Sequence, residues 1–208
     1  SKEILVIDDS SPDGTAEVVK KLQNKYKDLR LIVRTKREGL GAALREAYNN
    51  AKGDIIVSID SDMSFDENYI IALIKKIGEG YDMVTGSRHG VQGYYEKKYF
   101  KTNIKNFVSK FGNIIIRKTF NVSITDFTAN CRAIRKEVWH SLKSEENTNA
   151  MLVEMILKSK IKGYKVTEIP VVFKDRRYGK SKIVLSKEVP ILLIILLKLK
   201  IREILGKI

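Results

Sequence analysis

Short apolar runs alternate with polar turns along the first half of the chain. The runs over residues 4–7, 31–33, 55–59 and 82–86 have the length and character of buried strands. Between them, residues 16–26, 40–51 and 65–78 carry apolar side chains at helical spacing. A β-α-β-α-β succession with short connections predicts parallel strands joined by right-handed crossovers. We therefore expect an α/β domain with a mostly parallel sheet flanked by helices.

The second half mixes helices with isolated extended segments. Residues 98–120 predict one long helix, residues 123–134 an extended stretch, and residues 136–142 and 149–160 further helices. Residues 165–173 predict an edge strand, because Pro170 cannot donate a hydrogen bond inside a sheet. Two helices have a defined expected inner face: Ala16, Val19, Leu22 and Tyr26 in the first, and Phe107, Phe111, Ile114 and Ile115 in the long one, which is basic on its other side.

The tail differs from the rest of the chain. Residues 189–197 are strongly apolar apart from Pro190, and four cations follow them: Lys198, Lys200, Arg202 and Lys207. The run is far shorter than the roughly 20 apolar residues of a spanning helix. It fits an amphipathic helix at a membrane interface, the start of a longer membrane segment, or a terminal helix docked on the domain. We therefore expect a main domain over residues 1–185 and a separate tail over residues 186–208.

Composition narrows the classes of partner and site. The 39 Lys and Arg residues against 25 Asp and Glu give a formal net charge of +14, which favours anionic partners such as phosphates, nucleic acid or a lipid surface. The single Cys131 excludes an internal disulfide. With only His89 and His140 beside it, the chain lacks the residues of a typical zinc site.

Two carboxylates follow the apolar run over residues 55–59 directly. In an open α/β sheet, the carboxyl ends of the strands line the ligand crevice, so Asp60 and Asp62 would enter it together. Such a pair can hold a hard divalent cation whose other ligands are phosphate oxygens. The alternative is a solvated turn, since Asp and Ser are common turn residues.

The neighbouring motifs decide between these interpretations. Residues 8–15 (DDSSPDGT), 38–43 (EGLGAA), 53–54 (GD) and 60–62 (DSD) are followed by 86–88 (GSR), 126–128 (DFT), 132–133 (RA), 154–155 (EM), 163–164 (GY), 168–170 (EIP) and 176–182 (RRYGKSK). In order and spacing this set resembles family 2 glycosyltransferases of the Rossmann-like GT-A fold. Within them it is most similar to polyprenyl-phosphate sugar transferases such as the dolichol-phosphate mannose synthases. The resemblance covers roughly residues 3 to 185.

The resemblance implies a role for particular residues. The base and ribose of a sugar nucleotide would meet Ile7 and Asp9, and its metal-bound diphosphate would meet Asp60, Ser61 and Asp62. Substrate phosphates would meet Arg88, Arg176 and Lys182, and the acceptor phosphate Lys110, where many relatives carry Arg. Ser64 stands where some relatives use Gln to reach the metal, and Arg132 belongs to the substrate pocket. The catalytic set is Asp60, Asp62 and Arg88, and the metal set Asp60, Asp62 and Ser64, with Mg²⁺ or Mn²⁺ as the ion.

The implied reaction is the inverting transfer of a hexose to dolichyl or another polyprenyl phosphate. Mannose from GDP-mannose is the first choice of donor, and UDP-glucose or another UDP-sugar is the alternative. A phosphomonoester has a second pKa of about 6, so the acceptor is already an anionic nucleophile at neutral pH and requires no strong general base. The expected place of action is the cytoplasmic face of a membrane, with a possible membrane-anchoring partner or further C-terminal segment.

Two other classes of function stay open. The basic surface could serve a nucleic-acid-binding module, but the lysines are dispersed and no tyrosine platform accompanies them, so no nucleic acid is expected. A non-catalytic scaffold is the other possibility. Salt-sensitive duplex binding without sugar-nucleotide binding would favour the first of these.

Two further departures from the family pattern matter, and one matching residue has two possible roles. Relatives begin with a further strand inside the sheet, which this sequence lacks, and we expect the sequence to be part of a longer chain. Residues 130–132 (NCR) replace a more usual Gly-Phe-Arg, a change expected to alter the pocket below the sugar. Glu154 is either a buried partner of a cation or an ordinary helix residue, and its neighbours Val153 and Met155 favour the former.

Overall fold

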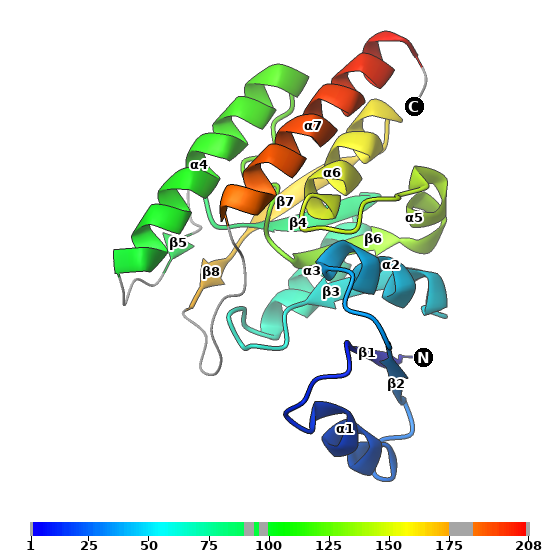
Figure 1. Cartoon of the computed structure of the whole chain (residues 1–208). Coiled ribbons are helices and arrows are strands. Elements are labelled where there is room, and N and C mark those ends of the chain that lie inside the picture. Colours follow the sequence, from blue (N-terminus) through cyan, green and yellow to red (C-terminus); the bar gives the residue numbers. More distant parts are fainter. Residues whose placement is uncertain (1, 90–93, 96–99, 175–184, 207–208) are drawn as a thin grey trace.

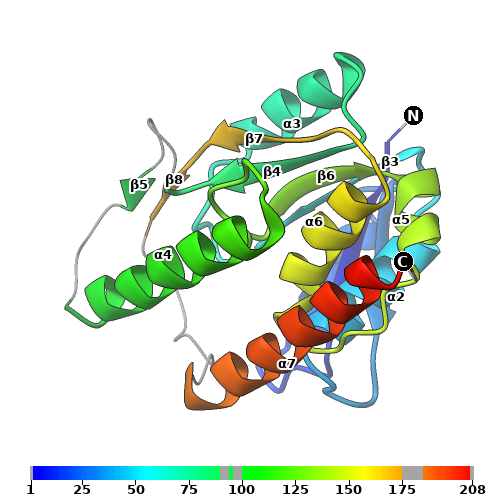
Figure 2. The ribbon, with the colours of Figure 1, turned by 90° about the horizontal axis from the view of Figure 1, so that it is seen from above.

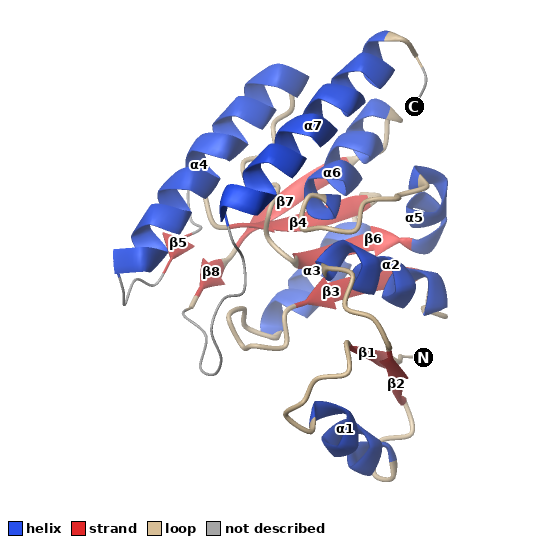
Figure 3. Ribbon diagram, in the orientation of Figure 1, coloured by secondary structure: helices blue, strands red, loops and turns tan. Residues whose placement is uncertain are grey.

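The computed structural model describes residues 2–89, 94–95, 100–174 and 185–206. The helices are α1 (Thr15–Gln23), α2 (Leu40–Asn50), α3 (Asn68–Gly78), α4 (Phe100–Phe120), α5 (Lys136–Leu142), α6 (Met151–Ile161) and α7 (Leu185–Ile204). The strands are β1 (Ile4–Asp8), β2 (Leu29–Val33), β3 (Ile55–Ile59), β4 (Met83–Ser87), β5 (Tyr94–Tyr95), β6 (Cys131–Arg135), β7 (Val166–Pro170) and β8 (Val172–Phe173). The alternation of strands and helices confirms the predicted α/β class (Figures 1 and 3).

A four-stranded sheet in the order β3-β6-β4-β7 forms the centre of the molecule. β4 and β7 are parallel, and β6 runs antiparallel to both β3 and β4. Three of the four strands therefore share one direction, as the mostly parallel prediction requires. β7 lies at the edge of this sheet, which confirms the edge strand predicted from Pro170.

Helices cover both faces of this sheet. Figure 2 shows α3 on one side of the strands and α6 and α7 on the other. On the α3 side, Leu73 and Ile77 pack with Val84 and Ala133. Alternate strand residues such as Met83 point to the opposite side, into a larger cluster formed with α4, α5, α6 and α7. The two clusters follow from the two-residue side-chain period of the strands.

β1 and β2 form a separate parallel pair with α1 beside them. β3 pairs with β6, and within the described residues β1 and β3 do not pair with each other. Direct pairing of β1 with β3 would have contradicted the expected additional strand. That strand, like the expected division into catalytic domain and tail, stays a prediction.

The EGLG motif brings the start of α2 against the segment before α6. A Cβ atom on Gly41 would lie 2.5 Å from the Glu146 carbonyl oxygen and 2.6 Å from that of Thr148. Gly39 adopts φ 110°, a conformation that residues with a side chain rarely take. The motif therefore requires glycine for close backbone approach and for this turn.

Two predicted inner faces are corrected by the structure. In α1, Ala16 and Val19 are buried as expected, but Leu22 is exposed. Tyr26, expected in the same helix, lies beyond its end at Gln23 and is also exposed. In the part of α4 whose side chains are described, residues 109–120, the predicted apolar face is wrong: Phe111, Ile114 and Ile115 are exposed, whereas Asn113, Ile116 and Phe120 are buried. The side chain of Phe107, the fourth predicted member, lies outside the described residues. The sequence suggested the wrong side of α4 because both sides carry apolar residues, and only packing into the cluster shared with α5, α6 and α7 selects between them.

α7 extends the predicted tail helix to twenty residues and includes Pro190. Its inner side packs Ile195, Leu196 and Leu199 into the cluster shared with α4 and α6. In the part of the chain that the structure describes, no helix combines the length and the apolarity needed to cross a membrane.

Candidate active site

The candidate site lies at the edge where β3 and β4 end and β6 begins. Ile59 pairs with Cys131, so Asp60, the residue after β3, faces Asn130, the residue before β6. The Asn130 Nδ2 donates a hydrogen bond of 2.8 Å to the Asp60 Oδ1. Arg88 follows β4, the neighbour of β6 on its other side. The sheet thus brings three separate loops to one edge.

A tight turn carries Asp62 beside Asp60. The backbone N–H of Ser64 donates a 3.0 Å hydrogen bond to the Asp62 Oδ1, closing an Asx turn. Met63, inside that turn, adopts φ 60°, which is uncommon for a residue with a side chain. Such conformations persist where the surrounding structure enforces them, and they concentrate at functional sites.

The donors of this turn suit a hard divalent cation. Asp60, Asp62 and Ser64 offer only oxygen, and the buried Ser64 Oγ has no hydrogen-bond partner within the described residues. No group of three or more His, Cys, Asp and Glu side chains with metal-binding geometry occurs in that same part of the chain. Two carboxylates with water and substrate phosphates in the remaining positions are a common arrangement for Mg²⁺. The residues therefore fit the predicted Mg²⁺ or Mn²⁺ ion.

Arg88 is fixed by a buried carboxylate. Its Nε donates to the Asp126 Oδ2 at 2.6 Å, and its Nη2 donates to the Asp126 Oδ1 at 2.9 Å and to the Thr128 Oγ1 at 2.6 Å. The guanidinium also lies 5.6 Å from the centre of the Phe173 ring. Burial acts to raise the pKa of the Asp126 carboxyl, but the Arg88 charge and hydrogen bonds hold that pKa well below its ordinary value. Arg88 is therefore a preorganised positive charge at the site.

A polar network extends from Arg88 towards α4. The His89 ring lies 3.3 Å from the Ser109 Oγ, which in turn contacts the Thr128 Oγ1 at 3.2 Å. Burial lowers the pKa of His89, and the nearby Asp126 carboxylate opposes this while the Arg88 and Lys110 charges reinforce it. Lys110, predicted to bind the acceptor, is thus close to His89 and its side chain is exposed. Sequence reasoning missed His89, because a single histidine beside a family motif gives no distinct signal.

Arg132 has a different position from the predicted one. Its side chain is fully buried, and the guanidinium donates to the backbone carbonyl oxygens of Leu152 at 2.8 Å, of Phe127 at 3.4 Å and of Ala129. This placement contradicts direct contact with a substrate. Arg132 instead joins the segment before β6 to the first turn of α6.

Asp9 and Ile7 belong to the β1 strand pair and its loop. The Arg34 Nη1 lies 3.1 Å from the Asp9 Oδ1, and the same buried guanidinium reaches Glu38 and Glu46 at 3.1 Å each. Arg34 therefore holds Asp9 against the start of α2. Sequence reasoning missed this arginine, whose position after β2 was its only signal. Ile7 lies in β1 with a half-buried side chain.

The remaining predicted residues have mixed outcomes. Ser61 is exposed in the turn after β3. Arg176 and Lys182 lie outside the described residues. The expectation for Glu154 is confirmed, because its buried carboxylate pairs with the Lys158 Nζ at 2.7 Å and accepts a hydrogen bond from Ser144. This ion pair lies within α6, away from the strand ends.

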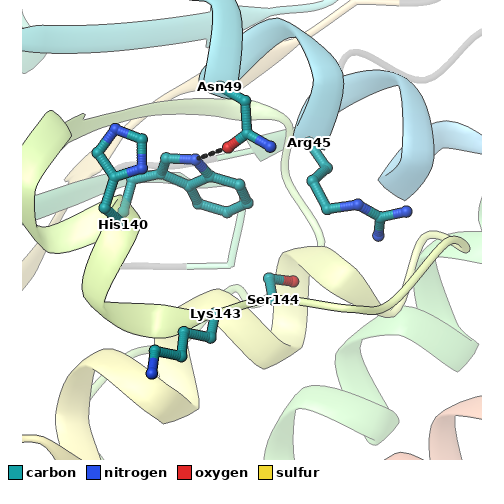
Figure 4. A pocket seen from close by; sticks show the side chains of 6 residues that line it. Arg45, Asn49, His140, Lys143 and Ser144 are labelled. Carbon is teal, nitrogen blue, oxygen red and sulfur yellow. Dashed lines mark hydrogen bonds between the residues drawn. The ribbon is translucent and has the colours of Figure 1, made fainter.

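A hollow between α2 and α5 contains none of the predicted site residues (Figure 4). It is lined by Arg45, Asn49, Trp139, His140, Lys143 and Ser144. The Trp139 Nε1 donates to the Asn49 Oδ1 at 2.8 Å, and Arg45 donates to the Glu146 carbonyl oxygen at 3.0 Å. Its main polar groups therefore serve to join α2 to the segments around it.

Two dolichol-phosphate mannosyltransferases are similar in sequence to this chain. A dolichol-phosphate mannosyltransferase of Pyrococcus furiosus is 33% identical over 182 residues, covering 87% of this chain and 50% of the relative. A dolichol-phosphate mannosyltransferase of Mycosarcoma maydis is 26% identical over 183 residues, covering 87% of this chain and 61% of the relative. The chain thus spans about half to three fifths of the length of these relatives.

Solved structures confirm the predicted GT-A fold. The glucosyl-3-phosphoglycerate synthase of Mycobacterium tuberculosis in complex with phosphoglyceric acid superposes with a TM-score of 0.66 at 16% identity, covering 97% of this chain and 68% of that one. A complex of the same enzyme with Mn²⁺, UDP-glucose and phosphoglyceric acid gives a TM-score of 0.65 over 96% of this chain and 67% of that one, also at 16% identity. At the level of whole sequences, the model of the glycosyl transferase family 2 matches residues 1–142, more than half of the chain. The chain therefore belongs to glycosyl transferase family 2.

Proposed function

We propose that this chain forms the catalytic part of an inverting transferase that moves a hexose from a sugar nucleotide to a polyprenyl phosphate. Mannose from GDP-mannose to dolichyl phosphate is the specific reaction proposed. The observation that carries the proposal is the Asp60–Ser61–Asp62 turn at the end of β3, at the same edge of the sheet as the anchored Arg88, in a member of this family. Relatives named dolichol-phosphate mannosyltransferase support the acceptor and the sugar.

The residues divide the work between the two anionic substrates. Asp60 and Asp62, together with Ser64, would hold a Mg²⁺ or Mn²⁺ ion, which would supply positive charge to the departing nucleoside diphosphate. Arg88 is already fixed by Asp126, so its charge acts on a substrate phosphate without reorganisation. Asp9, held by Arg34, would meet the nucleoside.

The acceptor side calls for cations rather than a base. Because a lipid monophosphate is largely ionised at neutral pH, its oxygen can attack the anomeric carbon directly and invert its configuration. Lys110 is exposed and close enough to His89 to affect its pKa, which places a positive charge next to the Arg88 region. Lysine offers a compact charge without the fork of an arginine, so the phosphate contact there would be a single point.

A membrane surface is the proposed place of action, on the cytoplasmic side. α7 exposes Leu193, Leu197, Ile201 and Ile204 at intervals of three and four residues, which places them on one helical face. The exposed Lys198 and Arg202 lie next to this face along the helix. An apolar face with cationic flanks is typical of helices that lie in the interface of an anionic membrane.

The test measures transfer of radiolabelled mannose from GDP-mannose to dolichyl phosphate. Transfer should require Mg²⁺ or Mn²⁺ and fall by at least about 100-fold in Asp62→Asn, since the neutral amide weakens the cation site. Glu67→Gln, which removes an exposed charge from the segment leading into α3, serves as the matched control and should leave transfer unchanged. Undiminished transfer in EDTA or in Asp62→Asn would refute the metal role.

The same experiment separates the donors. UDP-glucose is offered in parallel, because the structurally similar glucosyl-3-phosphoglycerate synthase was solved with that nucleotide sugar. Transfer from UDP-glucose and not from GDP-mannose would assign UDP-glucose as the donor and leave the proposed acceptor unchanged. No transfer from either donor, together with tight duplex binding that weakens with salt, would favour the nucleic-acid alternative.

A further inference from the structure

A chain of hydrogen bonds leads from the interior of the molecule to Asp60. The Tyr48 Oη lies 2.7 Å from the Ser58 Oγ, which lies 2.8 Å from the Asn130 Oδ1. The Asn130 Nδ2 then donates to the Asp60 Oδ1 at 2.8 Å. Tyr48 is 1% exposed, Asn130 6% and Ser58 8%, so water competes little for these bonds. These hydrogen bonds link α2, β3 and the segment before β6.

The chemistry of the four groups fixes the direction of every bond. An ionised carboxylate only accepts, so the amide NH₂ of Asn130 must face Asp60 and its oxygen must face Ser58. That oxygen takes the single hydroxyl proton of Ser58, and Tyr48 must therefore donate to the Ser58 Oγ. Burial raises the pKa of Tyr48, which keeps its hydroxyl protonated as this role requires.

The far end of the chain is anchored in the packed core. Tyr48 belongs to the cluster formed by α2, α5 and the sheet, and its ring meets that of Trp139 edge-on at 4.9 Å. The Trp139 Nε1 is itself bonded to Asn49, the next residue along α2. Tyr48 therefore has little freedom to move. Its hydrogen bond to Ser58, and that of Ser58 to Asn130, restrict the orientation of the Asn130 side chain in turn.

We propose that Asn130, held by Ser58 and Tyr48, is a positioning residue that fixes the direction of the Asp60 carboxylate for a divalent cation. Partners of a metal-binding carboxylate typically change metal affinity about 10- to 100-fold when they are removed. Here the partner is a neutral amide whose orientation is set by two further hydroxyl groups. The inference rests on the cation site of the proposed function and not on the identity of the sugar or acceptor.

The test measures Mn²⁺ binding by the electron paramagnetic resonance signal of the free ion, in the presence of UDP and, in parallel, of GDP. Asn130→Ala should weaken Mn²⁺ binding about tenfold, because it removes the direct partner of Asp60. Tyr48→Phe deletes one hydroxyl at nearly constant volume and should weaken binding by up to about fivefold, the equivalent of one neutral hydrogen bond.

A matched control separates positioning from stability. Asn113 is also a buried asparagine, 3% exposed, and its Oδ1 accepts a 3.2 Å hydrogen bond from the backbone N–H of Phe127. Asn113→Ala should lower the melting temperature as Asn130→Ala does, yet leave the Mn²⁺ affinity within twofold of wild type. Tyr48→Phe keeps the shape of the core and provides a folded variant if Asn130→Ala unfolds.

The outcomes are decisive in each direction. Weaker Mn²⁺ binding in Asn130→Ala and Tyr48→Phe but not in Asn113→Ala supports the inference. The inference is overturned if Asn130→Ala and Tyr48→Phe both keep a Mn²⁺ affinity within twofold of wild type. It is also overturned if the wild-type protein binds no Mn²⁺ with either nucleotide. Because sugar transfer is not measured, a protein that fails to glycosylate polyprenyl phosphate can still show the Mn²⁺ effect, so the two proposals fail separately.

Discussion

Replacing Asp126 by Asn tests the anchoring of Arg88 most directly. The carboxylate is fully buried and receives the Arg88 Nε at 2.6 Å, its Nη2 at 2.9 Å and its backbone N–H at 3.1 Å. The Arg88 side chain is only 10% exposed, so the substitution leaves a nearly buried guanidinium without its counter-charge.

Breaking one partner of such a buried pair costs about 3–5 kcal/mol. For a chain of this length, each kcal/mol shifts the melting temperature by about 2–4 °C, so we expect a fall of roughly 6–20 °C at pH 7. Thermal unfolding followed by circular dichroism measures it. Glu79→Gln, which breaks the exposed Lys76–Glu79 pair of equal N–O distance, is the control and should leave the melting temperature almost unchanged.

The effect should also depend on pH in a defined direction. The pKa of Asp126 is lowered on folding, so its charge stabilises the native state fully above the ordinary value of 3.8 and progressively less below it. The difference in melting temperature between wild type and Asp126→Asn should therefore become smaller as the pH falls below about 4. The reasoning would be refuted if Asp126→Asn lowered the melting temperature at pH 7 no more than Glu79→Gln does. It would also be refuted if the difference from wild type stayed unchanged at low pH.

Two further predictions concern the core and the tail. Burial raises the pKa of the Cys131 thiol to about 12, so a thiol reagent at pH 8 should modify the native protein far more slowly than the urea-unfolded protein, and equal rates would contradict the burial. The second prediction is measured by vesicle sedimentation with anionic lipid. The double substitution Leu193→Ser and Leu197→Ser should weaken vesicle binding by about tenfold or more, because apolar contact is lost. The control Ile71→Ser, on the exposed surface of α3, should leave vesicle binding unchanged. Equal binding by all variants would argue against α7 as the interfacial element.

Most local elements were predictable from the sequence to within a few residues. The extended stretch predicted over residues 123–134 is an exception, because its strand β6 begins only at Cys131. The predicted helix over residues 136–142 coincides with α5, and the long helix over residues 98–120 with α4. Such assignments depend on apolar spacing, which is a local property of the chain. Which side of α4 is buried was not predictable, because both sides carry apolar residues and only the tertiary cluster shared with α5, α6 and α7 selects Ile116 and Phe120.

The acidic residues of the candidate site were predictable from the sequence, but the residues that hold the site in place were not. Asp60 and Asp62 follow an apolar strand, and that order alone places them at an end of the sheet. Arg88 was recognised from the family motif, but its attachment to Asp126 joins residues 38 positions apart. Arg132 was assigned to substrate because its motif gives no information on depth, and the structure buries it instead.

The succession of strands and helices, the acidic turn after β3 and the membership in glycosyl transferase family 2 could all be inferred from the order of residue types along the chain. The position of β6 between β3 and β4 could not, because it results from packing in three dimensions. That placement sets Asn130 against Asp60 and completes the link to Tyr48, 82 residues earlier in the chain. Strand order and side-chain depth arise from packing between distant segments, which the linear pattern does not specify.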